Sequence, residues 1–472
     1  MCGIAGIFLS KEGNAADLIS LSLFSQQHRG QESCGIAYVD GDRIKLHKGM
    51  GLVKEVLSVD LLKGIKSRIA IGHVRYPTQG GTTLENSQPH LIETLRGPIY
   101  AVSSNGDLIN YHILRKEMER IGVYLSTKND GELIGKFLVH RLEKVEREMV
   151  RAISELFTVF LGAYSTVFLQ PDLLVGFRDP FGFRPMFLGE IEGGYAITSE
   201  TCAMDVLRAK NVREIEPAEI VIVSDRGVES FRPNVKNLRK GRGHFAHCIF
   251  EMIYFARPDS YIFGEYVYKF RKKIGEILAT YDDFKADCVI PVPDSSNFIA
   301  QGYAEKSGIP FEMGLIRNHY VGRTFIKPIQ SFRDESVKQK FNPLKDFFKG
   351  KKVVLVDDSI VRGTTLRKIV RMIKGAGARE IHVRIGSPPV KFPCYYGIDT
   401  PTFEELVANQ MSVSDIERYI EADSLKYFKR EDFKLLVPNV NDFCCACFDG
   451  NYPVGSVDKK EVEELRNLKH SI

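Results

Sequence analysis

The sequence lacks a hydrophobic run long enough to span a membrane. Its most apolar stretch, residues 156–168, is broken by Thr158, Gly162, Ser165 and Thr166, whereas a transmembrane helix needs about 20 predominantly apolar residues. The N-terminus also lacks the basic segment and the apolar core that together make a secretory signal peptide. These absences predict a cytoplasmic protein without a membrane partner.

The sequence also has little excess of charge of one sign, and it contains no internal repeat or low-complexity tract. Its 65 Lys and Arg residues nearly balance its 60 Asp and Glu residues, which leaves a formal charge of +5. The densest basic run, NLRKGR at residues 237–242, is short and typical of a solvated connector. The charge therefore gives no support to a nucleic-acid partner, although it is compatible with small anionic substrates.

The length of 472 residues favours two domains, because a single hydrophobic core seldom grows beyond about 250–300 residues. Hydrophobic residues make up 44% and charged residues 26% of the chain, the balance of a folded globular protein. A basic, glycine-containing segment near residues 233–243 separates two halves with different patterns. We therefore predict one domain over residues 1–232 and a second over residues 233–472.

The first half is predicted to be an α+β domain with layered β-sheets. Short apolar and aromatic runs such as residues 97–103 and 162–168 are bounded by Gly, Asn or Pro, as the strands of packed sheets often are. Between such runs, residues 114–121 and 132–145 have the apolar spacing of helices.

The second half has the pattern of an α/β domain. Residues 286–292 and 351–357 are nearly continuous apolar runs, which are typical of parallel strands buried on both faces. Helical patterns follow at residues 297–307 and from about residue 366, as the crossover connections of a parallel sheet require. Residues 461–468 favour a short charged helix.

The second residue, Cys2, is a candidate nucleophile. Methionine before a small residue is normally removed, which would leave a thiol and an α-amine on this one residue. The α-amine has a pKa of about 8, so its neutral form can accept the thiol proton and later protonate leaving ammonia. Taken alone, a cysteine at this position would be interpreted as incidental.

Five motifs place this cysteine in a wider pattern. They are CGIAGIF at residues 2–8, HRGQES at 28–33, GHVRYPTQG at 72–80, SNGDL at 104–108 and DGE at 130–132. In this order, over about 230 residues, they resemble the glutaminase domain of the N-terminal-nucleophile amidotransferases. The resemblance implies that Cys2 hydrolyses glutamine and releases ammonia.

The residue types in these motifs suggest how glutamine would be bound. Arg75 has a fork of donors suited to a substrate α-carboxylate, and Asp130 can accept from a substrate α-ammonium group. The resemblance implies that the Asn105 side chain and the Gly106 backbone N–H form an oxyanion hole. It also places Arg29 near the bound glutamine, although an arginine at a helix end can serve in a salt bridge instead.

Residues 353–365, VVLVDDSIVRGTT, carry the second candidate site. A buried strand ends in Asp357 and Asp358, and a loop of Gly, Ser and Thr leads into a helix. Ligands of open parallel sheets bind at this edge, where loop N–H groups would hold a phosphate and the acids would bind ribose hydroxyls or Mg²⁺. An acid pair alone could merely cap a helix, but the full segment resembles the phosphoribosylpyrophosphate motif of phosphoribosyltransferases. The resemblance implies these binding residues: Asp357, Asp358, Ser359, Arg362, Gly363, Thr364 and Thr365.

Two further segments belong to this site by resemblance. PVPDSSN at residues 291–297 follows another buried strand and is similar to a pyrophosphate loop, with Ser295 in the position that helps to bind Mg²⁺. Residues 317–340 are basic and resemble the flexible loop that closes over the substrate and supplies cations to the leaving pyrophosphate. A solvated charged loop would have the same composition.

CIFEMIYFARPDS at residues 248–260 joins the two halves. With it, nearly the whole chain resembles the glutamine phosphoribosylpyrophosphate amidotransferases, which commit metabolites to purine synthesis. The resemblance implies that ammonia passes internally to phosphoribosylpyrophosphate and gives 5-phosphoribosylamine, glutamate and pyrophosphate, with inversion at the ribose carbon. It also implies feedback inhibition by purine nucleotides, a homotetramer, and a coupling region that includes Tyr254, for which a core aromatic residue is the alternative.

Two other functions fit the sequence less well. An amidotransferase that makes an aminosugar or asparagine would need an isomerase or ATP-pyrophosphatase partner, and residues 353–365 argue against both. A non-catalytic nucleotide sensor would have no use for an ammonia-generating site built from Cys2, Arg75, Asn105 and Asp130.

Four cysteines of the second half suggest a metal centre. Cys444 and Cys447 have the C-x-x-C spacing of ligands for zinc or an iron–sulfur cluster, and Cys248 and Cys394 can complete a set of four. Family members with cysteines at these places carry a structural [4Fe–4S] cluster, so the resemblance implies the iron–sulfur-containing type. Cys445 leaves the ligand pair ambiguous. The following cysteines are predicted to be reduced core residues: Cys34, Cys202 and Cys288.

Overall fold

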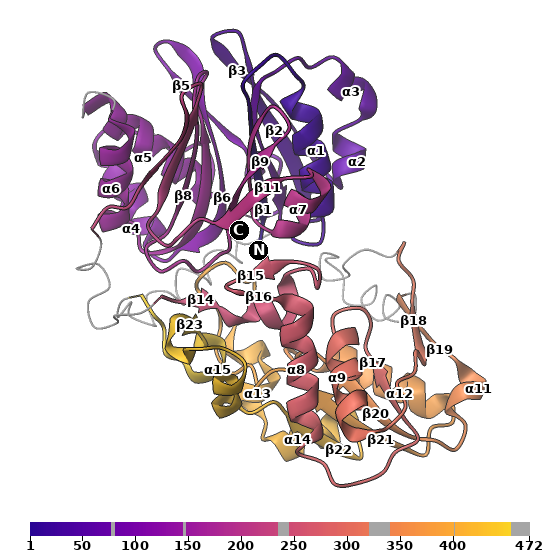
Figure 1. Cartoon of the computed structure of the whole chain (residues 1–472). Helices are drawn as coiled ribbons and strands as arrows, with labels where there is room; N and C mark the ends of the chain where they lie inside the picture. Colours follow the sequence, from indigo (N-terminus) through magenta and orange to yellow (C-terminus); the bar gives the residue numbers. More distant parts are fainter. Residues whose placement is uncertain (77–80, 145–147, 235–244, 321–339, 401, 455–472) are drawn as a thin grey trace.

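The computed structural model describes residues 1–76, 81–144, 148–234, 245–320, 340–400 and 402–454. Figure 1 shows two lobes, the upper one formed by the first half of the chain and the lower one by the second half. The predicted helix at residues 461–468 and most of the predicted loop at residues 317–340 lie outside the described residues.

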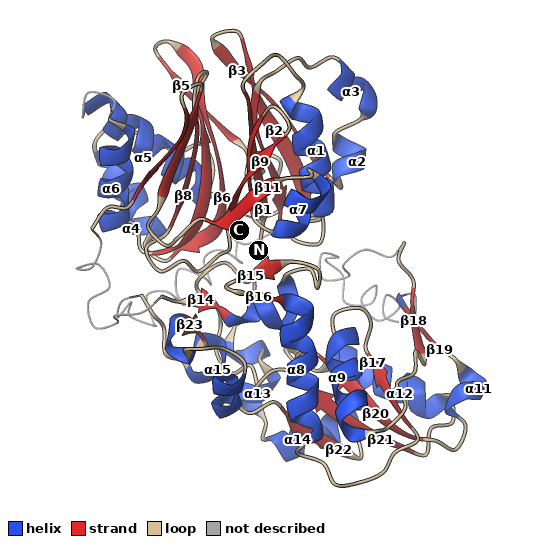
Figure 2. Ribbon diagram, viewed as in Figure 1, coloured by secondary structure: helices blue, strands red, loops and turns tan. Residues whose placement is uncertain are grey.

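Two antiparallel sheets form the upper lobe and share a core between them (Figure 2). The first has the strand order β11-β9-β10-β1-β4-β2-β3, and the second has the order β13-β12-β8-β7-β6-β5. The first sheet contains β1 (Gly3–Leu9), β2 (Ser33–Asp40), β3 (Arg43–Met50), β4 (Ile69–Arg75), β9 (Phe187–Ile191), β10 (Gly194–Thr198) and β11 (Lys210–Glu214). The second contains β5 (His90–Thr94), β6 (Gly97–Leu108), β7 (Gly162–Leu169), β8 (Leu174–Arg178), β12 (Ile220–Ser224) and β13 (Gly227–Phe231).

Helices cover the outer face of each sheet. Because successive strand residues face opposite sides, apolar residues of the first sheet also pack on α1 (Ala15–Ser25), and those of the second sheet pack on α5 (Asp130–Lys144). The other helices of this lobe are α2 (Val53–Val56), α3 (Val59–Lys63), α4 (Tyr111–Arg120), α6 (Met149–Val159) and α7 (Thr201–Val206). The predicted α+β class with layered sheets is confirmed.

A four-stranded parallel sheet forms the centre of the lower lobe, in the order β17-β20-β21-β22. Residues 353–356 in its second strand are all buried, which explains their continuous apolar character. The strands are β17 (Cys288–Pro291), β20 (Lys352–Asp357), β21 (Glu380–Ile385) and β22 (Ser424–Tyr427). The predicted α/β class with a parallel sheet is confirmed.

Helices lie on both faces of the parallel sheet. α8 (Val267–Ala279) and α9 (Asn297–Ser307) contribute to the core on one face, and α12 (Thr364–Gly375) and α14 (Val413–Ile420) contribute to the core on the other. The smaller elements are β18 (Leu315–Arg317), β19 (Phe341–Pro343), α11 (Lys345–Phe348), η4 (Phe403–Glu405), α13 (Val407–Gln410), η5 (Arg430–Leu435) and η6 (Val440–Asp442).

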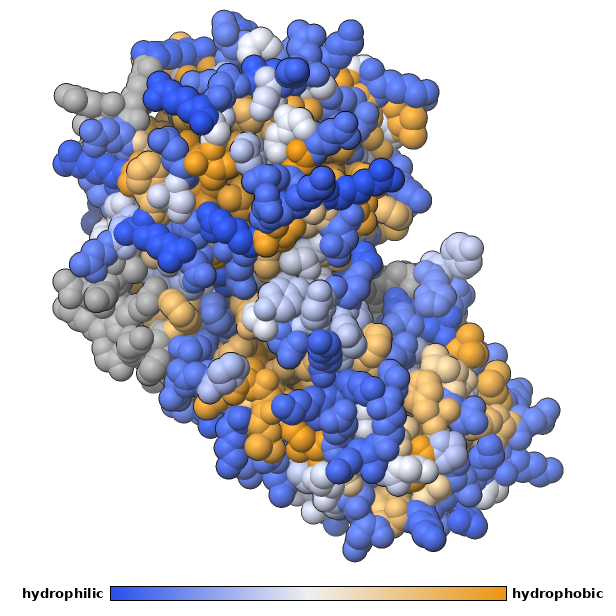
Figure 3. All heavy atoms as spheres, viewed as in Figure 1, coloured by the Kyte–Doolittle hydropathy of each residue, from blue (hydrophilic) through white to orange (hydrophobic). Residues whose placement is uncertain are grey.

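Cys34, Cys202 and Cys288 are at most 1% exposed, so their predicted place in the core is confirmed. Hydrophilic side chains cover most of the face drawn in Figure 3, with apolar side chains in scattered patches. In the described ranges, no helix is both long and apolar enough to cross a membrane.

A joining segment packs against both halves. It contains β14 (His247–Cys248), the π-helical turn η2 (Glu251–Phe255), β15 (Tyr261–Ile262) and β16 (Glu265–Tyr266). The N–H group of Ala246 donates to the Phe181 carbonyl at 2.8 Å, and that of Cys248 donates to the Phe183 carbonyl at 3.1 Å. β14 also pairs in parallel with β23 (Phe443–Cys444), which precedes α15 (Ala446–Asp449).

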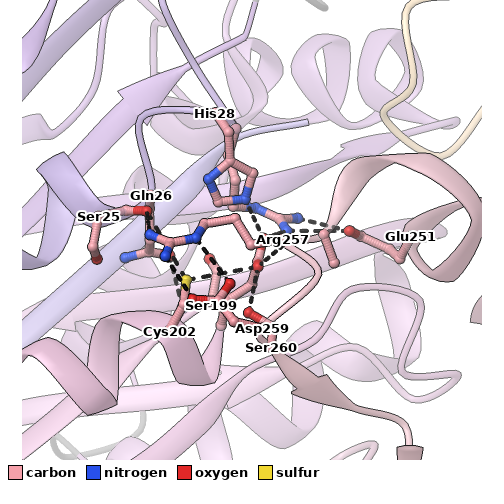
Figure 4. Close-up of polar contacts among 12 residues, drawn as sticks. Ser25, Gln26, His28, Ser199, Cys202, Glu251, Arg257, Asp259 and Ser260 are labelled. Carbon is pink, nitrogen blue, oxygen red and sulfur yellow. Dashed lines mark hydrogen bonds and ion pairs between the residues drawn. The ribbon is translucent and has the colours of Figure 1, made fainter. Parts of the chain in front are cut away.

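A buried ion-pair network joins the halves at this segment (Figure 4). Arg29, which follows α1, donates to a Glu200 oxygen through Nη1 and to Glu251 Oε1 through Nη2 at 2.7 Å. Glu200 also accepts from Ser260 Oγ at 2.7 Å and from the Arg257 N–H at 2.9 Å. Residues from both halves of the chain therefore share one set of buried charges.

Charge pairing in this network outweighs the cost of burial. Burial acts to raise the pKa of Glu200, but His28 and Arg29 hold it well below its ordinary value. Burial acts to lower the pKa of Arg29, and the carboxylates of Glu251 and Glu200 raise it overall. Each charge depends on its partners, because an uncompensated buried charge is strongly unfavourable.

We expect Glu200→Gln to lower the free energy of unfolding by about 3 kcal/mol at pH 7, because the buried Arg29 charge loses one carboxylate. The shift in the urea midpoint measures this change. Since the folded-state pKa of Glu200 is depressed, its contribution is present above its ordinary pKa of 4.5 and is lost as the pH falls. The difference in the free energy of unfolding between wild type and Glu200→Gln should therefore become smaller below pH 4.5.

Asp415→Asn is the control for this measurement, because the ion pair of Asp415 with Arg418 is exposed. This variant should unfold at the urea concentration of the wild type. Equal shifts in the urea midpoint for the two substitutions would contradict the expected contribution of the buried network to stability.

Candidate active sites

The candidate nucleophile lies at the start of a central strand. Cys2 directly precedes β1, which pairs with β4 on one side and β10 on the other. Every residue of β1 is buried, so the strand holds the first residues of the chain inside the domain. Met1 is also buried, and its sulfur lies beside the Arg184 guanidinium.

Contacts from both sheets fix the position of Cys2. Its backbone N–H donates to Asn105 Oδ1 at 3.0 Å, and its carbonyl accepts from Arg29 Nε at 2.9 Å. Its Sγ lies 3.7 Å from the carbonyl oxygen of Tyr76. Asn105 belongs to β6 of the second sheet and Tyr76 follows β4 of the first, so the thiol is held where the two sheets meet.

Asn105 has a side-chain donor without a hydrogen-bond partner among the described residues. The residue is completely buried, and while its Oδ1 accepts from Cys2, its Nδ2 has no hydrogen-bond partner among the described residues. Leaving a buried donor unpaired costs free energy. Such a donor beside a nucleophile is suited to stabilise an oxygen that becomes negative during a reaction, which fits the predicted oxyanion role of Asn105.

The next residue, Gly106, is a glycine for steric reasons. It pairs with Tyr164 of β7, and a Cβ atom at Gly106 would lie 1.8 Å from the carbonyl oxygen of Ala163. Any other residue would therefore push β6 away from β7.

The predicted glutamine-binding pair acts on the thiol electrostatically. Burial raises the pKa of Cys2, the N-terminal amine and Arg75 lower it, and Asp130 raises it. Arg75 ends β4 and Asp130 begins α5, so two separate elements bring these side chains to the nucleophile. Because the thiol pKa is raised overall, the nucleophile needs a base.

Glu32 is a partner of Arg75 that sequence reasoning missed. Arg75 Nη1 donates to Glu32 Oε2 at 2.8 Å and to the Gly81 carbonyl at 2.9 Å. Both charged side chains are 1% exposed, so this pair fixes the direction of the guanidinium. Residues 77–80, which complete the GHVRYPTQG motif, lie outside the described residues.

Arg29 lies behind the nucleophile. Its Nε binds the Cys2 carbonyl, its other nitrogens bind Glu200 and Glu251, and it has no exposed surface. These contacts agree with the alternative considered for Arg29, in which it forms a structural salt bridge. A role beside bound glutamine stays a prediction.

The second candidate site lies at the carboxyl edge of the parallel sheet. β20 ends at Asp357, and α12 begins after Gly363, which has a φ of 74°. Asp358 accepts from Ser359 Oγ at 2.6 Å and from Ser295 Oγ of the loop after β17. The structure thus brings the predicted acids together with the predicted Mg²⁺-binding serine.

Burial disfavours the ionised form of both acids. It raises the pKa of Asp357 and of Asp358, and the charge of Asp358 raises the pKa of Asp357 further. Hydrogen bonds from Ser295 and Ser359 and the charge of Arg271 on α8 act in the opposite direction on Asp358. A bound cation would favour the ionised form of both.

The remaining predicted phosphate-binding residues lie around the first turn of α12. Thr364 is exposed and Thr365 is half-buried, and Arg362 Nη2 donates to Glu405 at 2.9 Å. Residues 321–339 of the predicted closing loop lie outside the described residues.

Tyr254 belongs to η2 and lies among aromatic rings. Its ring centroid is 5.1 Å from that of Phe255 and 6.0 Å from that of Phe250. This packing corresponds to the core-aromatic alternative, and a coupling role stays a prediction.

The candidate cluster cysteines come from three segments near the junction. Cys248 of β14 is in register with Cys444 of β23, and the charges of Cys248 and Cys394 act on both Cys444 and Cys447. None of the four forms a disulfide with another described cysteine. Burial first, and then neighbouring thiolates including Cys445, raise the pKa of Cys444 and Cys447 well above the ordinary value.

No group of three or more His, Cys, Asp or Glu side chains is arranged to hold a metal ion in the part of the chain that the structure describes. This finding applies to the cysteines near the junction and to the acids after β20 alike.

Several charged residues that support the sites had no clear signal in the sequence. Glu200 and Glu251 lie 171 and 222 residues from Arg29, and Arg271 lies on a helix without a motif. Glu32 belongs to the HRGQES motif and Glu251 to the joining segment CIFEMIYFARPDS, so both positions were marked by a motif although their arginine partners were not.

Known families match both halves of the chain. The family described as the glutamine amidotransferase domain matches residues 82–206. The family described as the phosphoribosyl transferase domain matches residues 265–385.

Relatives match over nearly the whole length. The amidophosphoribosyltransferase of Archaeoglobus fulgidus is 45% identical, and the match covers 98% of this chain and 100% of that protein. A solved structure of the allosteric regulatory enzyme of purine biosynthesis is 39% identical, with a TM-score of 0.86 and 97% of each chain covered. The glutamine phosphoribosylpyrophosphate amidotransferase from B. subtilis, complexed with ADP and GMP, is also 39% identical, with a TM-score of 0.85 over 97% of this chain and 98% of that one.

Proposed function

This chain belongs to the amidophosphoribosyltransferase family, and we propose that its two candidate sites share the reaction of that family. It is a glycosyltransferase-type enzyme of the first step of purine biosynthesis. We assign residues 1–232 to the glutaminase domain and residues 233–472 to the phosphoribosyltransferase domain. The end of β13 at Phe231 supports this division, because all strands of the parallel sheet follow it.

At the first site, Cys2 hydrolyses glutamine. Once Met1 is removed, the α-amine takes the Sγ proton, and the sulfur forms a bond to the carbon of the substrate's side-chain amide. The amine then protonates the nitrogen, which leaves as ammonia, and water cleaves the thioester to give glutamate. Arg75 and Asp130 hold the α-carboxylate and the α-ammonium group of the substrate.

The observation that carries this assignment is the Nδ2 of Asn105, which has no hydrogen-bond partner among the described residues, on the side chain that binds the Cys2 backbone nitrogen. Because Asn105 Oδ1 holds the backbone nitrogen of Cys2, the same side chain fixes the base and offers a donor to the tetrahedral intermediate. The Gly106 N–H is the second donor of this oxyanion hole. Arg29 supports the nucleophile from its carbonyl side.

At the second site, ammonia attacks the ribose carbon of phosphoribosylpyrophosphate, and pyrophosphate leaves with inversion. Asp357 and Asp358 bind the ribose hydroxyls, and residues 359–365 hold the 5-phosphate at the start of α12. Mg²⁺, when bound, neutralises charge on the pyrophosphate, and Ser295 and the two acids would hold it. Burial raises the pKa of both acids, and a bound cation would favour their ionised forms.

We propose that the cysteines near the junction hold a [4Fe–4S] cluster, although the described residues contain no side-chain group already arranged to bind a metal ion. Cys248, Cys394, Cys444 and Cys447 would hold it, and the cluster, when bound, supplies positive charge that lets buried thiols exist as thiolates. Neighbouring thiolates repel one another and raise the pKa of Cys444 and Cys447, so a positively charged cluster would favour their thiolate forms. The backbone N–H of Tyr396 already donates to Cys394 Sγ at 3.3 Å, as is common for cluster ligands.

Regulation and assembly follow from the family. Because the relative from B. subtilis was solved with ADP and GMP, we propose that purine nucleotides inhibit this enzyme too. A homotetramer in the cytoplasm is the assembly and location that the resemblance supports. Tyr254 would belong to the region that couples the two sites, and the loop at residues 317–340 would close over the phosphoribosyl substrate during turnover.

We expect Cys2→Ala to lower glutamine-dependent synthesis of phosphoribosylamine by at least about 10³-fold, because the nucleophile is lost. Synthesis from high concentrations of free ammonia should remain, since it uses only the second site. Steady-state rates with each nitrogen source measure both effects. Cys34→Ala, which removes a buried thiol from β2 of the same sheet, should retain both activities, and an equal loss of ammonia-dependent activity in a folded Cys2→Ala variant would refute this division of labour.

Asp358→Asn should lower synthesis from either nitrogen source by roughly 10²-fold, because both routes end at the ribose site. Asp287→Asn is the matched control, since this acid accepts from the Lys352 N–H at the opposite end of the same strand pair. Normal ammonia-dependent turnover of Asp358→Asn would exclude the assigned ribose site.

Anaerobically purified protein should be brown and contain about four irons per chain, as a [4Fe–4S] cluster requires. Cys447→Ala should lose iron, while Cys445→Ala should keep it. Elemental analysis decides the outcome, and stoichiometric zinc without iron or sulfide would overturn the cluster assignment without affecting either active site.

A further inference from the structure

We propose that Gly397 of the second domain is a positioning residue for glutamine hydrolysis. It lies in the segment 394–400, called here the cysteine loop because it begins at Cys394. This segment lies against the strand that carries Asn105 and Gly106. The inference rests on the proposed oxyanion role of these two residues.

The closeness of the contact leaves no room for a side chain at Gly397. A Cβ atom there would lie 2.9 Å from the Gly106 carbonyl carbon and 3.0 Å from its carbonyl oxygen. The φ of Gly397 is +101°, which also favours glycine. On its other side, Gly106 abuts the Ala163 carbonyl of β7. The oxyanion glycine is therefore held between a neighbouring strand and a loop from the other domain.

The first domain holds the cysteine loop in this position. Arg184, which is completely buried, donates to the Tyr396 carbonyl. The Phe183 ring stacks on the Tyr396 ring with centroids 4.3 Å apart and an angle of 24° between the planes. Two neighbouring residues of the glutaminase half thus clamp the residue immediately before Gly397.

Contacts within the second domain also restrain the loop. The Cys394 N–H donates to Thr400 Oγ1 at 2.6 Å, which closes the loop on itself. The Val454 N–H donates to the Tyr396 hydroxyl at 3.3 Å. The peptide of Gly397 consequently has little freedom to retreat from Gly106.

The same loop reaches the substrate side of the site. Burial raises the pKa of Glu32, and the charge of Asp399, two residues after Gly397, raises it further. Since Glu32 is the partner of Arg75, the loop lies near the proposed α-carboxylate site as well as the proposed oxyanion hole.

A rigid contact at this point has a direct catalytic consequence. An oxyanion donor is effective only when it already points at the developing charge, and small displacements of such groups reduce rates strongly. The docked second domain therefore completes the glutaminase site, and the loop should affect the transition state more than the binding of glutamine.

The test compares Gly397→Ala with Gly450→Ala. Gly450 is a matched control, because it ends α15 with a φ of 74° and its Cβ atom would lie 3.0 Å from the Phe392 ring, away from Gly106. Gly397→Ala should lower kcat with glutamine by about 10-fold or more, with a smaller change in KM. Ammonia-dependent kcat, which reports the folded second domain, should stay within about twofold of wild type in both variants.

Phe183→Leu provides a second variant that introduces no clash. It removes the ring that stacks on Tyr396 and should lower the ratio of glutamine-dependent to ammonia-dependent kcat in the same direction. If Gly397→Ala does not fold, this ratio decides the question. An unchanged ratio in Phe183→Leu, or equal ratios in Gly397→Ala and Gly450→Ala, would overturn the positioning role.

The activity of Cys2→Ala distinguishes the two possible failures. If Cys2→Ala still uses glutamine, the proposed function itself is wrong. If Cys2→Ala loses glutamine use while Gly397→Ala behaves like Gly450→Ala, only the role of the cysteine loop is wrong.

Discussion

The guanidinium of Arg29 is the constraint on which the arrangement of the two halves depends. It is buried with the carboxylates of Glu200 and Glu251, the first from the glutaminase half and the second from the joining segment. None of these charges is stable in the interior without the others. The halves must therefore dock before the interior is electrically balanced, and Arg29 then holds the Cys2 carbonyl from the same position. The same arginine therefore links the docking of the halves to the position of Cys2, the proposed nucleophile.

The turn η2 connects this constraint to the second site. Glu251 at its start binds Arg29, while the Met252 and Ala256 carbonyls accept from Arg271 of α8 at 2.9 and 2.8 Å. Burial lowers the pKa of Arg271 to about 10, and the charge of Asp358 acts against that decrease. The π-helical turn η2, a feature frequent at functional sites, thus binds Arg29 near Cys2 on one side and Arg271 near Asp358 on the other.

Sequence patterns predicted elements and motifs well because both are local. Residues 297–307 were expected to be helical and are the bounds of α9, and residues 351–357 differ from β20 by one residue. The partners of Arg29 could not be predicted, because Glu200 lies in no motif and the apolar run around Glu251 does not indicate which charge this acid would meet. The approach of Gly397 to Gly106 had no signal either, since it depends on how two domains pack. Local elements and motifs could therefore be predicted from the sequence, whereas contacts between the two halves could be identified only from the structure.

These contacts across the junction all make the first site depend on the position of the second half. Ammonia released by a glutaminase domain that is not docked would escape to solvent, so hydrolysis is useful only when the second site is in place. In this fold the proposed nucleophile Cys2 is held by an arginine whose charge network includes the joining segment, and Gly106 beside Asn105 contacts a loop of the second half. The cysteine loop begins at Cys394, and Arg184 lies close enough to Cys248 and Cys394 for their charges to raise its pKa against the effect of burial. If Cys394 binds the proposed cluster, the cluster would restrain the same loop that packs against the strand of Asn105 and Gly106, and it would do so without contacting the substrate.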